Sequence, residues 1–227
     1  RNFDMYTQFL LSRGYSVLKV NYRGSTGRGR QFVERLYDDW GGGEQEDIAE
    51  AVRHVTAEEW VDEDRVVVFG GSYGGYSAYW QMVQYPELYA AGIAWIGVTD
   101  LEDMFENTMP HFRTELMEKY LGTPEENPQL YRERSPVTHV ENLAAPLLMV
   151  HGVNDRRVPV SQARIFRDAL DEAGFEEGEN ADYEYVELGE EGHASSDIDQ
   201  KIRMLRTLDD FLKRRLPEAT TTPAADD

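Results

Sequence analysis

The sequence predicts an α/β fold built on a mostly parallel β-sheet. Short apolar runs typical of strands alternate with longer stretches in which apolar residues recur at helical spacing, and this alternation implies a sheet with helices on both faces. The run RVVVFG at residues 65–70 contains four consecutive apolar residues, as expected for a strand buried on both faces. With 227 residues, 41% of them hydrophobic, the chain can fill one large core.

The first part of the chain predicts a helix, a strand and a second helix. The apolar residues at helical spacing are Tyr6, Phe9 and Leu10 in the first helix and Ile48, Val52 and Val55 in the second. Gly14 ends the first helix. Residues 15–24 (YSVLKVNYRG) favour a strand because they are rich in β-branched and aromatic side chains. From Glu46 onward, acidic residues give the second helix an acidic outer face.

The remaining elements continue the alternation. Strands are predicted at 65–70, 90–97, 146–152 and 182–188, and helices at 74–85, 161–173 and 197–216. Residues 100–140 interrupt this order with charged and Pro-containing helical pieces, which we expect above the edge of the sheet. Residues 217–227 have few side chains that could pack, so we expect one domain over 1–216 and a disordered acidic tail.

The strongly negative charge excludes one class of partner. The chain has 43 acidic and 23 basic residues, a net charge of −20, so it lacks the basic surface expected for nucleic-acid binding. An ordinary acidic cytoplasmic protein is one interpretation. Adaptation to the salt-rich cytoplasm of a halophile is the other, because salt screens the repulsion between like charges. Arginine outnumbers lysine and the acids are spread along the whole chain, which favours the halophile interpretation.

Two absences in the sequence remove further classes of function. No apolar run approaches the roughly 18 residues needed to cross a bilayer, so we expect no membrane partner and a cytoplasmic location. The sequence contains no cysteine, which excludes a disulfide scaffold, a thiol nucleophile and a cysteine-ligated metal. Any nucleophile must therefore be oxygen or nitrogen.

A glycine-rich motif with a central serine joins a predicted strand to a predicted helix. Gly70, Ser72 and Gly74 fit the pattern G-x-S-x-G, in which a sharp turn exposes the serine Oγ and glycines avoid clashes between the strand and the helix. A phosphate cradle is the alternative for such a turn. GGSYGG lacks the Lys and Ser/Thr of a P-loop and is not G-x-G-x-x-G, so we favour a nucleophilic serine.

A nucleophilic serine needs a base, and the base needs an acid that orients it. In α/β-hydrolases these partners follow in the order serine, acid, histidine. Asp155 follows the predicted strand 146–152, and His193 lies in a Gly-flanked loop after the strand 182–188. Asp182 and Asp197 are competing acids that more plausibly flank or cap an element. The other histidines, which we interpret as packing or surface residues, are His54, His111, His139 and His151.

Several separated strings resemble the catalytic domain of the prolyl oligopeptidase family of serine peptidases, most closely its acylaminoacyl-peptidase-like and dipeptidyl-peptidase-like members. These strings are NYRGSTGRGRQF, DWGGGEQEDI, VFGGSYGGY, HGVNDRRVP and GEEGH, and the likeness covers roughly residues 5–215. The resemblance implies an α/β-hydrolase fold that needs no metal or cofactor. It makes Ser72 the nucleophile, Asp155 the orienting acid and His193 the general base. It also implies that the backbone N–H of Tyr73 stabilises the oxyanion and that Arg157 contacts a substrate carbonyl.

The resemblance also implies features that this sequence does not contain. Family members carry an N-terminal β-propeller that restricts access to short peptides, and an HGGP-like turn that supplies a second oxyanion donor. We therefore expect a hydrolase domain without its first strands, and weak activity of the isolated chain, since losing one oxyanion donor costs about 2.7–4 kcal/mol. Two other functions stay open: an esterase or other acyl hydrolase, and a non-catalytic fragment. The oligomeric state is open too, a homo-oligomer included.

Overall fold

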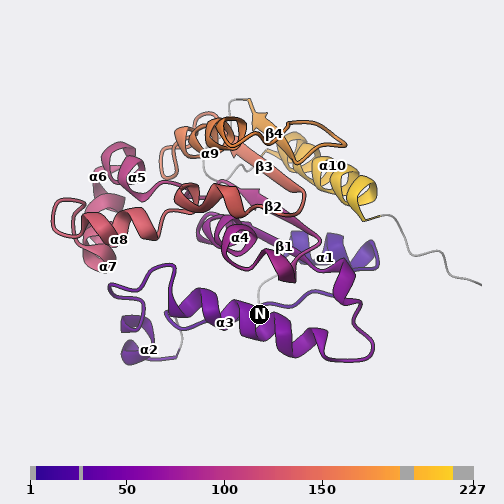
Figure 1. The fold of residues 1–227 in the computed structure, drawn as a ribbon, viewed down its shortest axis with the longest axis horizontal. Helices are drawn as coiled ribbons and strands as arrows, with labels where there is room; N and C mark the ends of the chain where they lie inside the picture. Colours follow the sequence, from indigo (N-terminus) through magenta and orange to yellow (C-terminus); the bar gives the residue numbers. More distant parts are fainter. Residues whose placement is uncertain (1–3, 26–27, 190–196, 217–227) are drawn as a thin grey trace, which may run out of the picture.

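A computed structural model of the chain describes residues 4–25, 28–189 and 197–216 (Figure 1). The strands are β1 (Val67–Gly71), β2 (Ala91–Trp95), β3 (Leu147–Gly152) and β4 (Tyr183–Leu188). The longer helices are α1 (Met5–Ser12), α3 (Gly43–Thr56), α4 (Tyr73–Gln84), α9 (Ser161–Glu172) and α10 (Ile198–Arg215). Shorter helical pieces are α2 (Arg30–Glu34), η1 (Glu63–Arg65), η2 (Pro86–Leu88), α5 (Leu101–Asn107), α6 (Pro110–Phe112), η3 (Arg113–Glu118), α7 (Lys119–Leu121), α8 (Pro128–Glu133) and η4 (Pro136–Asn142).

The four strands form one parallel sheet in the order β1-β2-β3-β4. Each strand therefore ends at the same edge of the sheet, and each crossover carries a helical segment, as parallel pairing requires. The predicted α/β class is confirmed, and the four strands predicted from residue 65 onward are present within two residues of the expected bounds.

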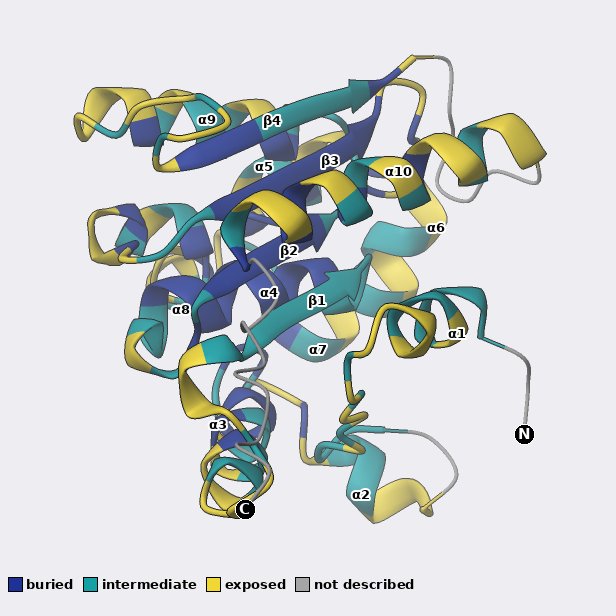
Figure 2. Ribbon diagram, turned by 90° about the vertical axis from the view of Figure 1, so that its right-hand side faces the viewer, coloured by how far each residue is buried: buried dark blue, intermediate teal, exposed yellow. Residues whose placement is uncertain are grey.

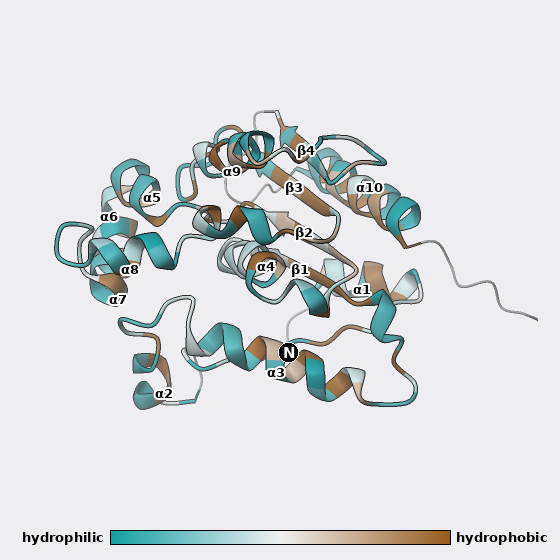
Figure 3. Cartoon of the chain, viewed as in Figure 1, coloured by the Kyte–Doolittle hydropathy of each residue, from teal (hydrophilic) through white to brown (hydrophobic). Residues whose placement is uncertain are grey.

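Alternating side chains on the strands pack into two separate cores, one on each face of the sheet. On one face, Met149 packs with Tyr79 of α4 and Phe166 of α9. On the other face, Leu148 packs with Phe211 of α10, and α1 joins this second core. Figure 2 shows α10 and α1 on one side of the sheet and α4 on the other, and Figure 3 shows the apolar residues of β1 and β3 between them. The helices thus cover both faces, as predicted.

The predicted strand at residues 15–24 is wrong. Residues 15–22 form no strand, and residues 16–21 make no backbone hydrogen bond with any other described residue. A groove of about 1350 Å³ lies between this segment and β1, with Val17 and Val20 among its lining residues on one side and Val67 and Phe69 on the other. The apolar pattern of the segment therefore faces an open groove rather than a neighbouring strand, and β1 is an edge strand of the sheet that the described residues form.

The second predicted helix is present as α3, but only Val52 of the three apolar residues that predicted it is buried. Its buried residues are Gly43, Glu44, Gln45, Ala49 and Val52. Ile48 and Val55, which were expected in the core, are half-buried and line the same groove beside β1. The acid Glu44, which lies in the first turn, is fully buried.

The predicted excursion between β2 and β3 consists of α5 to η4, which gather beside the sheet in Figure 1. Hydrogen bonds attach it to the neighbouring elements. Thr108 Oγ1 donates to the carbonyl oxygen of Arg157 (2.7 Å), and Ser161 Oγ donates to Asp103 Oδ2 (2.8 Å). No helix among the described residues is long and apolar enough to cross a membrane. The predicted tail 217–227 lies outside the described residues.

Candidate active site

Ser72 lies on a sharp turn between β1 and α4. Its φ and ψ angles are 58° and −114°, a conformation that non-glycine residues rarely adopt and that costs on the order of 1–3 kcal/mol. The surrounding backbone holds this turn: the Ser72 N–H donates to the carbonyl oxygen of Trp95 (3.0 Å), and the Ser72 carbonyl accepts from the Tyr76 N–H (3.0 Å). Serine at the start of a helix commonly caps it, yet Ser72 makes no capping hydrogen bond.

Glycine is required at two positions around this turn. A Cβ on Gly70 would lie 2.1 Å from the carbonyl oxygen of Gly74, and a Cβ on Gly75 would lie 2.4 Å from the carbonyl oxygen of Trp95. Helix α4 therefore approaches β1 and β2 more closely than any side chain would permit. The steric prediction for Gly74 itself is wrong, because a Cβ there would meet no heavy atom within 4 Å. Gly74 instead contributes the backbone that crowds Gly70.

A second strained residue directly follows Trp95, whose carbonyl oxygen accepts the hydrogen bond from Ser72. Ile96, directly after β2, has a φ angle of 44°, and positive φ is rare for β-branched residues. It is buried, and its N–H donates to the carbonyl oxygen of Val150 in β3 (2.8 Å). The carboxyl end of β2 is therefore fixed on both sides, to the serine turn through Trp95 and to β3 through Ile96.

The backbone N–H of Tyr73, the predicted oxyanion donor, lies at the N-terminus of α4. Tyr73 is the first residue of α4, where a helix has no acceptor of its own for the N–H group. Among the described residues, no backbone or side-chain oxygen accepts this hydrogen. The partial positive charge at the helix N-terminus also favours a developing negative charge at this point.

Asp155 lies in the loop that follows β3, at the same edge of the sheet as Ser72. Its side chain is buried, and the carboxylate oxygen Oδ1 accepts hydrogen bonds from the backbone N–H groups of Arg157 and Val158, both at 2.9 Å. These bonds fix the orientation of the carboxylate within a tight loop.

His151 supports this loop, a role that the sequence did not reveal. It is fully buried on β3, and its Nε2–H donates to the carbonyl oxygen of Val158 (2.6 Å). Thr108 supports the loop from the excursion through its hydrogen bond to the Arg157 carbonyl (2.7 Å). The Arg157 side chain, the predicted substrate contact, is exposed, and so is that of its neighbour Arg156.

Only β2 separates β1 from β3, so the ends of these strands are roughly 10 Å apart. In a catalytic triad an imidazole bonds the serine hydroxyl on one side and the carboxylate on the other, at about 2.8 Å each. His193 lies among residues 190–196, outside the described residues, so its placement stays a prediction. The last described residue before this segment is Gly189, which directly follows β4.

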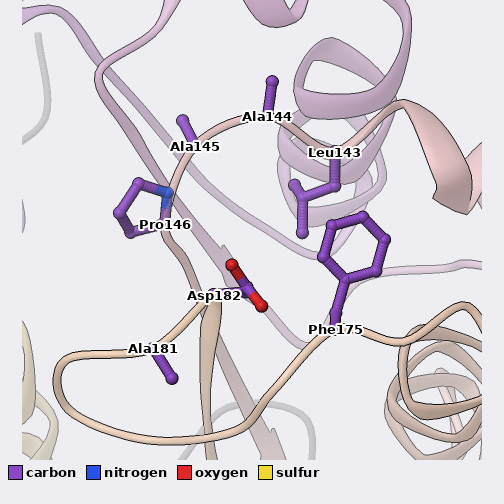
Figure 4. Close-up of a pocket in the computed structure, with 7 residues that line it drawn as sticks. All are labelled: Leu143, Ala144, Ala145, Pro146, Phe175, Ala181 and Asp182. Carbon is purple, nitrogen blue, oxygen red and sulfur yellow. The ribbon is translucent and has the colours of Figure 1, made fainter.

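A small pocket of about 120 Å³ lies at the opposite end of the sheet (Figure 4). Leu143 to Pro146 line it just before β3, and Ala181 and Asp182 line it just before β4. Asp182, one of the competing acids, accepts a hydrogen bond there from the Glu176 N–H (2.8 Å). Asp197, the other, caps the N-terminus of α10 by accepting from the Asp199 N–H (2.8 Å). Both acids therefore serve local structure.

A strained serine on a strand-to-helix turn, on a parallel sheet covered by helices, defines an α/β-hydrolase. The chain belongs to the prolyl oligopeptidase family, a family of serine peptidases whose model matches residues 1–218. It is 32% identical to dipeptidyl aminopeptidase BIII of Pseudoxanthomonas mexicana over 192 residues, which cover 83% of this chain and 27% of the relative. It is 34% identical to the acylamino-acid-releasing enzyme of Mus musculus over 177 residues, which cover 73% of this chain and 23% of the relative.

Solved structures agree with this assignment. The crystal structure of Porphyromonas gingivalis dipeptidyl peptidase 4 superposes with a TM-score of 0.81 at 26% identity, covering 93% of this chain and 28% of that one. The chain thus spans less than a third of the length of each of these relatives.

Proposed function

We propose that this chain is the hydrolase domain of a serine peptidase that cleaves short peptides through an acyl-enzyme. In this mechanism Ser72 attacks the scissile carbonyl, and His193 takes the serine proton and returns it to the leaving amine. Asp155 orients the imidazole and stabilises its protonated form. The Tyr73 N–H donates to the oxyanion of the tetrahedral intermediate. Water then repeats the attack on the acyl-enzyme and releases the acid product.

One observation carries the proposal above the others. Ser72 occupies the capping position of α4 in a strained conformation, yet its hydroxyl does not cap the helix. A serine that served only the fold would relax into the capping geometry, which stabilises a helix by about 1 kcal/mol. Strain maintained at a polar residue is typical of a functional site.

The proposed substrate class comes from the family. Two of the relatives described above are named for releasing dipeptides or acylamino acids from peptides, which supports a peptide substrate. Restriction to short peptides depends on a β-propeller, which we propose for the full-length protein. An esterase on the same fold is the competing proposal, because a serine, histidine and aspartate triad does not distinguish amides from esters.

Turnover of paired substrates separates the two proposals. The full-length protein would be assayed with a dipeptidyl 4-nitroanilide, an N-acetyl-aminoacyl 4-nitroanilide and a 4-nitrophenyl butyrate ester. We expect turnover of at least one anilide, lost in Ser72→Ala. Turnover of the ester alone would replace the peptidase proposal with the esterase, and persistent turnover in Ser72→Ala would remove the serine mechanism.

The proposal also fixes the pH dependence of the rate. A protonated imidazole cannot accept the serine proton, so with a histidine pKa of about 6.5 the value of kcat/KM should fall as the pH drops below roughly 6. A rate that is flat from pH 5 to pH 8 would contradict the role of His193 as the base.

A further inference from the structure

We propose that Glu44 is a positioning residue of this site, which fixes the Tyr73 side chain and thereby the orientation of the Tyr73 backbone N–H. The inference rests on the proposed function, because it assigns the Tyr73 N–H to the oxyanion. Glu44 lies in the first turn of α3 and is fully buried. Its oxygen Oε1 accepts a hydrogen bond from the Tyr73 hydroxyl (2.8 Å) and another from the Gly41 N–H.

The second carboxyl oxygen of Glu44 makes the residue unusual. Oε2 is buried and has no hydrogen-bond partner among the described residues. A buried polar atom left without a partner costs on the order of 1–3 kcal/mol, so an acid at this position lowers the stability of the fold. A functional role for its other contacts would explain why an acid is present here. Burial raises the pKa of Glu44, because desolvation disfavours the charged carboxylate.

The ring of Tyr73 is enclosed by aromatic side chains from three other places in the chain. Its centroid lies 5.2 Å from that of Trp40, 5.7 Å from that of Tyr76 and 5.8 Å from that of Tyr22. These contacts confine the ring laterally, but apolar contacts are weakly directional. The hydrogen bond to Glu44 fixes the position of the ring along its own axis.

Fixing this ring has a consequence for the reaction. The Tyr73 side chain and the Tyr73 N–H share one Cα atom, and this residue directly follows the strained Ser72. Because the aromatic neighbours confine the ring laterally, a shift of the ring along its own axis would move this Cα and thereby turn the peptide group whose N–H is assigned to the oxyanion. Such preorganised donors act mainly on the transition state, so their displacement lowers kcat more than it raises KM.

A purely structural role for Glu44 is the alternative, and the next residue on α3 supplies a control. Gln45 is equally buried, and its side chain links α3 to α4: Nε2 donates to Ser77 Oγ (2.8 Å), and Oε1 accepts from the Gln81 amide (3.1 Å). The Gln81 amide also donates to the backbone carbonyl of Gln45 (2.9 Å). No hydrogen bond joins Gln45 to Tyr73 among the described contacts. Gln45→Ala therefore disturbs the same helix pair without touching Tyr73.

The experiment compares Glu44→Ala, Glu44→Gln, Tyr73→Phe and Gln45→Ala in the full-length protein, measuring kcat and KM for a peptidyl 4-nitroanilide together with the melting temperature. We expect kcat of Glu44→Ala to fall about tenfold with KM within about twofold, since even a 1 Å misplacement costs up to about 100-fold. Glu44→Gln keeps an oxygen that accepts from Tyr73 and should recover most of the lost rate. Gln45→Ala should lower the melting temperature and leave kcat within about twofold of the wild type.

Tyr73→Phe keeps the test decisive if Glu44→Ala fails to fold, because it removes a single oxygen from the same hydrogen bond. Its kcat should fall as in Glu44→Ala. Wild-type kcat in Tyr73→Phe, no recovery in Glu44→Gln, or an equal loss of kcat in Gln45→Ala would overturn the role of Glu44. A wild-type enzyme with no turnover of any 4-nitroanilide or ester would overturn the proposed function as well, so the two failures are distinguishable.

Discussion

Replacing Gly70 by alanine tests the geometry of the serine turn directly. The new Cβ would lie 2.1 Å from the carbonyl oxygen and 2.3 Å from the carbonyl carbon of Gly74, whereas ordinary contact begins near 3.4 Å. Both clashing atoms belong to the backbone, so no side chain can rotate away. The strand and the helix must therefore separate by about 1 Å at the position of Ser72.

This separation has two measurable effects. Overpacking of this kind costs about 2 kcal/mol, which lowers the melting temperature of a protein of this size by about 4–8 °C. A displacement of about 1 Å at the nucleophile lowers kcat by roughly 100-fold. Thermal denaturation followed by circular dichroism measures the first effect, and turnover of a peptidyl 4-nitroanilide by the folded protein measures the second.

Gly74→Ala is the matched control within the same turn. A Cβ at this position meets nothing within 4 Å, and alanine favours the helix over glycine by up to about 1 kcal/mol. We therefore expect the melting temperature of Gly74→Ala to equal or exceed that of the wild type. If Gly70→Ala melts within 1 °C of the wild type and keeps kcat within about twofold, the close approach of strand and helix is not what holds Ser72.

Three further predictions concern the substrate contact, an ion pair and the net charge. Arg157→Ala should raise KM about tenfold with little change in kcat, while Arg156→Ala should leave both unchanged; equal effects would remove the assigned contact. Arg164 donates two hydrogen bonds to Glu187 (2.7 Å and 3.0 Å) and lowers the pKa of Glu187 to about 2. The stabilisation by this ion pair is present above the ordinary pKa of 4.5 and is lost as the pH falls towards 2. Glu187→Gln should therefore lower the free energy of unfolding, measured in urea, by about 1 kcal/mol at pH 7. The difference in unfolding free energy between the variant and the wild type should shrink towards pH 3. With a net charge of −20, the melting temperature should rise between low and molar salt; a constant value would show that charge repulsion does not limit stability.

The sequence predicted the elements whose signals are local. The four strands from residue 65 onward, the helices that follow them and the turn at Ser72 all depend on apolar runs, glycines and prolines within a few residues. Asp155 was predicted from its position after β3, and the structure places it at the same edge of the sheet as Ser72. His193 stays a prediction, since residues 190–196 lie outside the described residues.

The features that the sequence missed depend on contacts between distant segments. Residues 15–24 have the composition of a strand, but a strand forms only where a neighbour completes its hydrogen bonds, and here the segment faces a groove. The burial of Glu44 runs against the polarity of its side chain, and it depends on hydrogen bonds from the Gly41 N–H and from Tyr73 on another helix. The role of His151 likewise depends on a contact that its position at a strand end does not predict, the hydrogen bond to the carbonyl oxygen of Val158.

Covalent labelling of the nucleophile tests the central claim most directly. The full-length protein would be treated with a fluorophosphonate, and the modified residue identified by mass spectrometry of its peptides. A single adduct on Ser72 is expected, absent in His193→Ala and formed at least about 1000-fold more slowly in Asp155→Asn. An unmodified wild type, an adduct on another residue, or labelling of His193→Ala at the wild-type rate would contradict the triad.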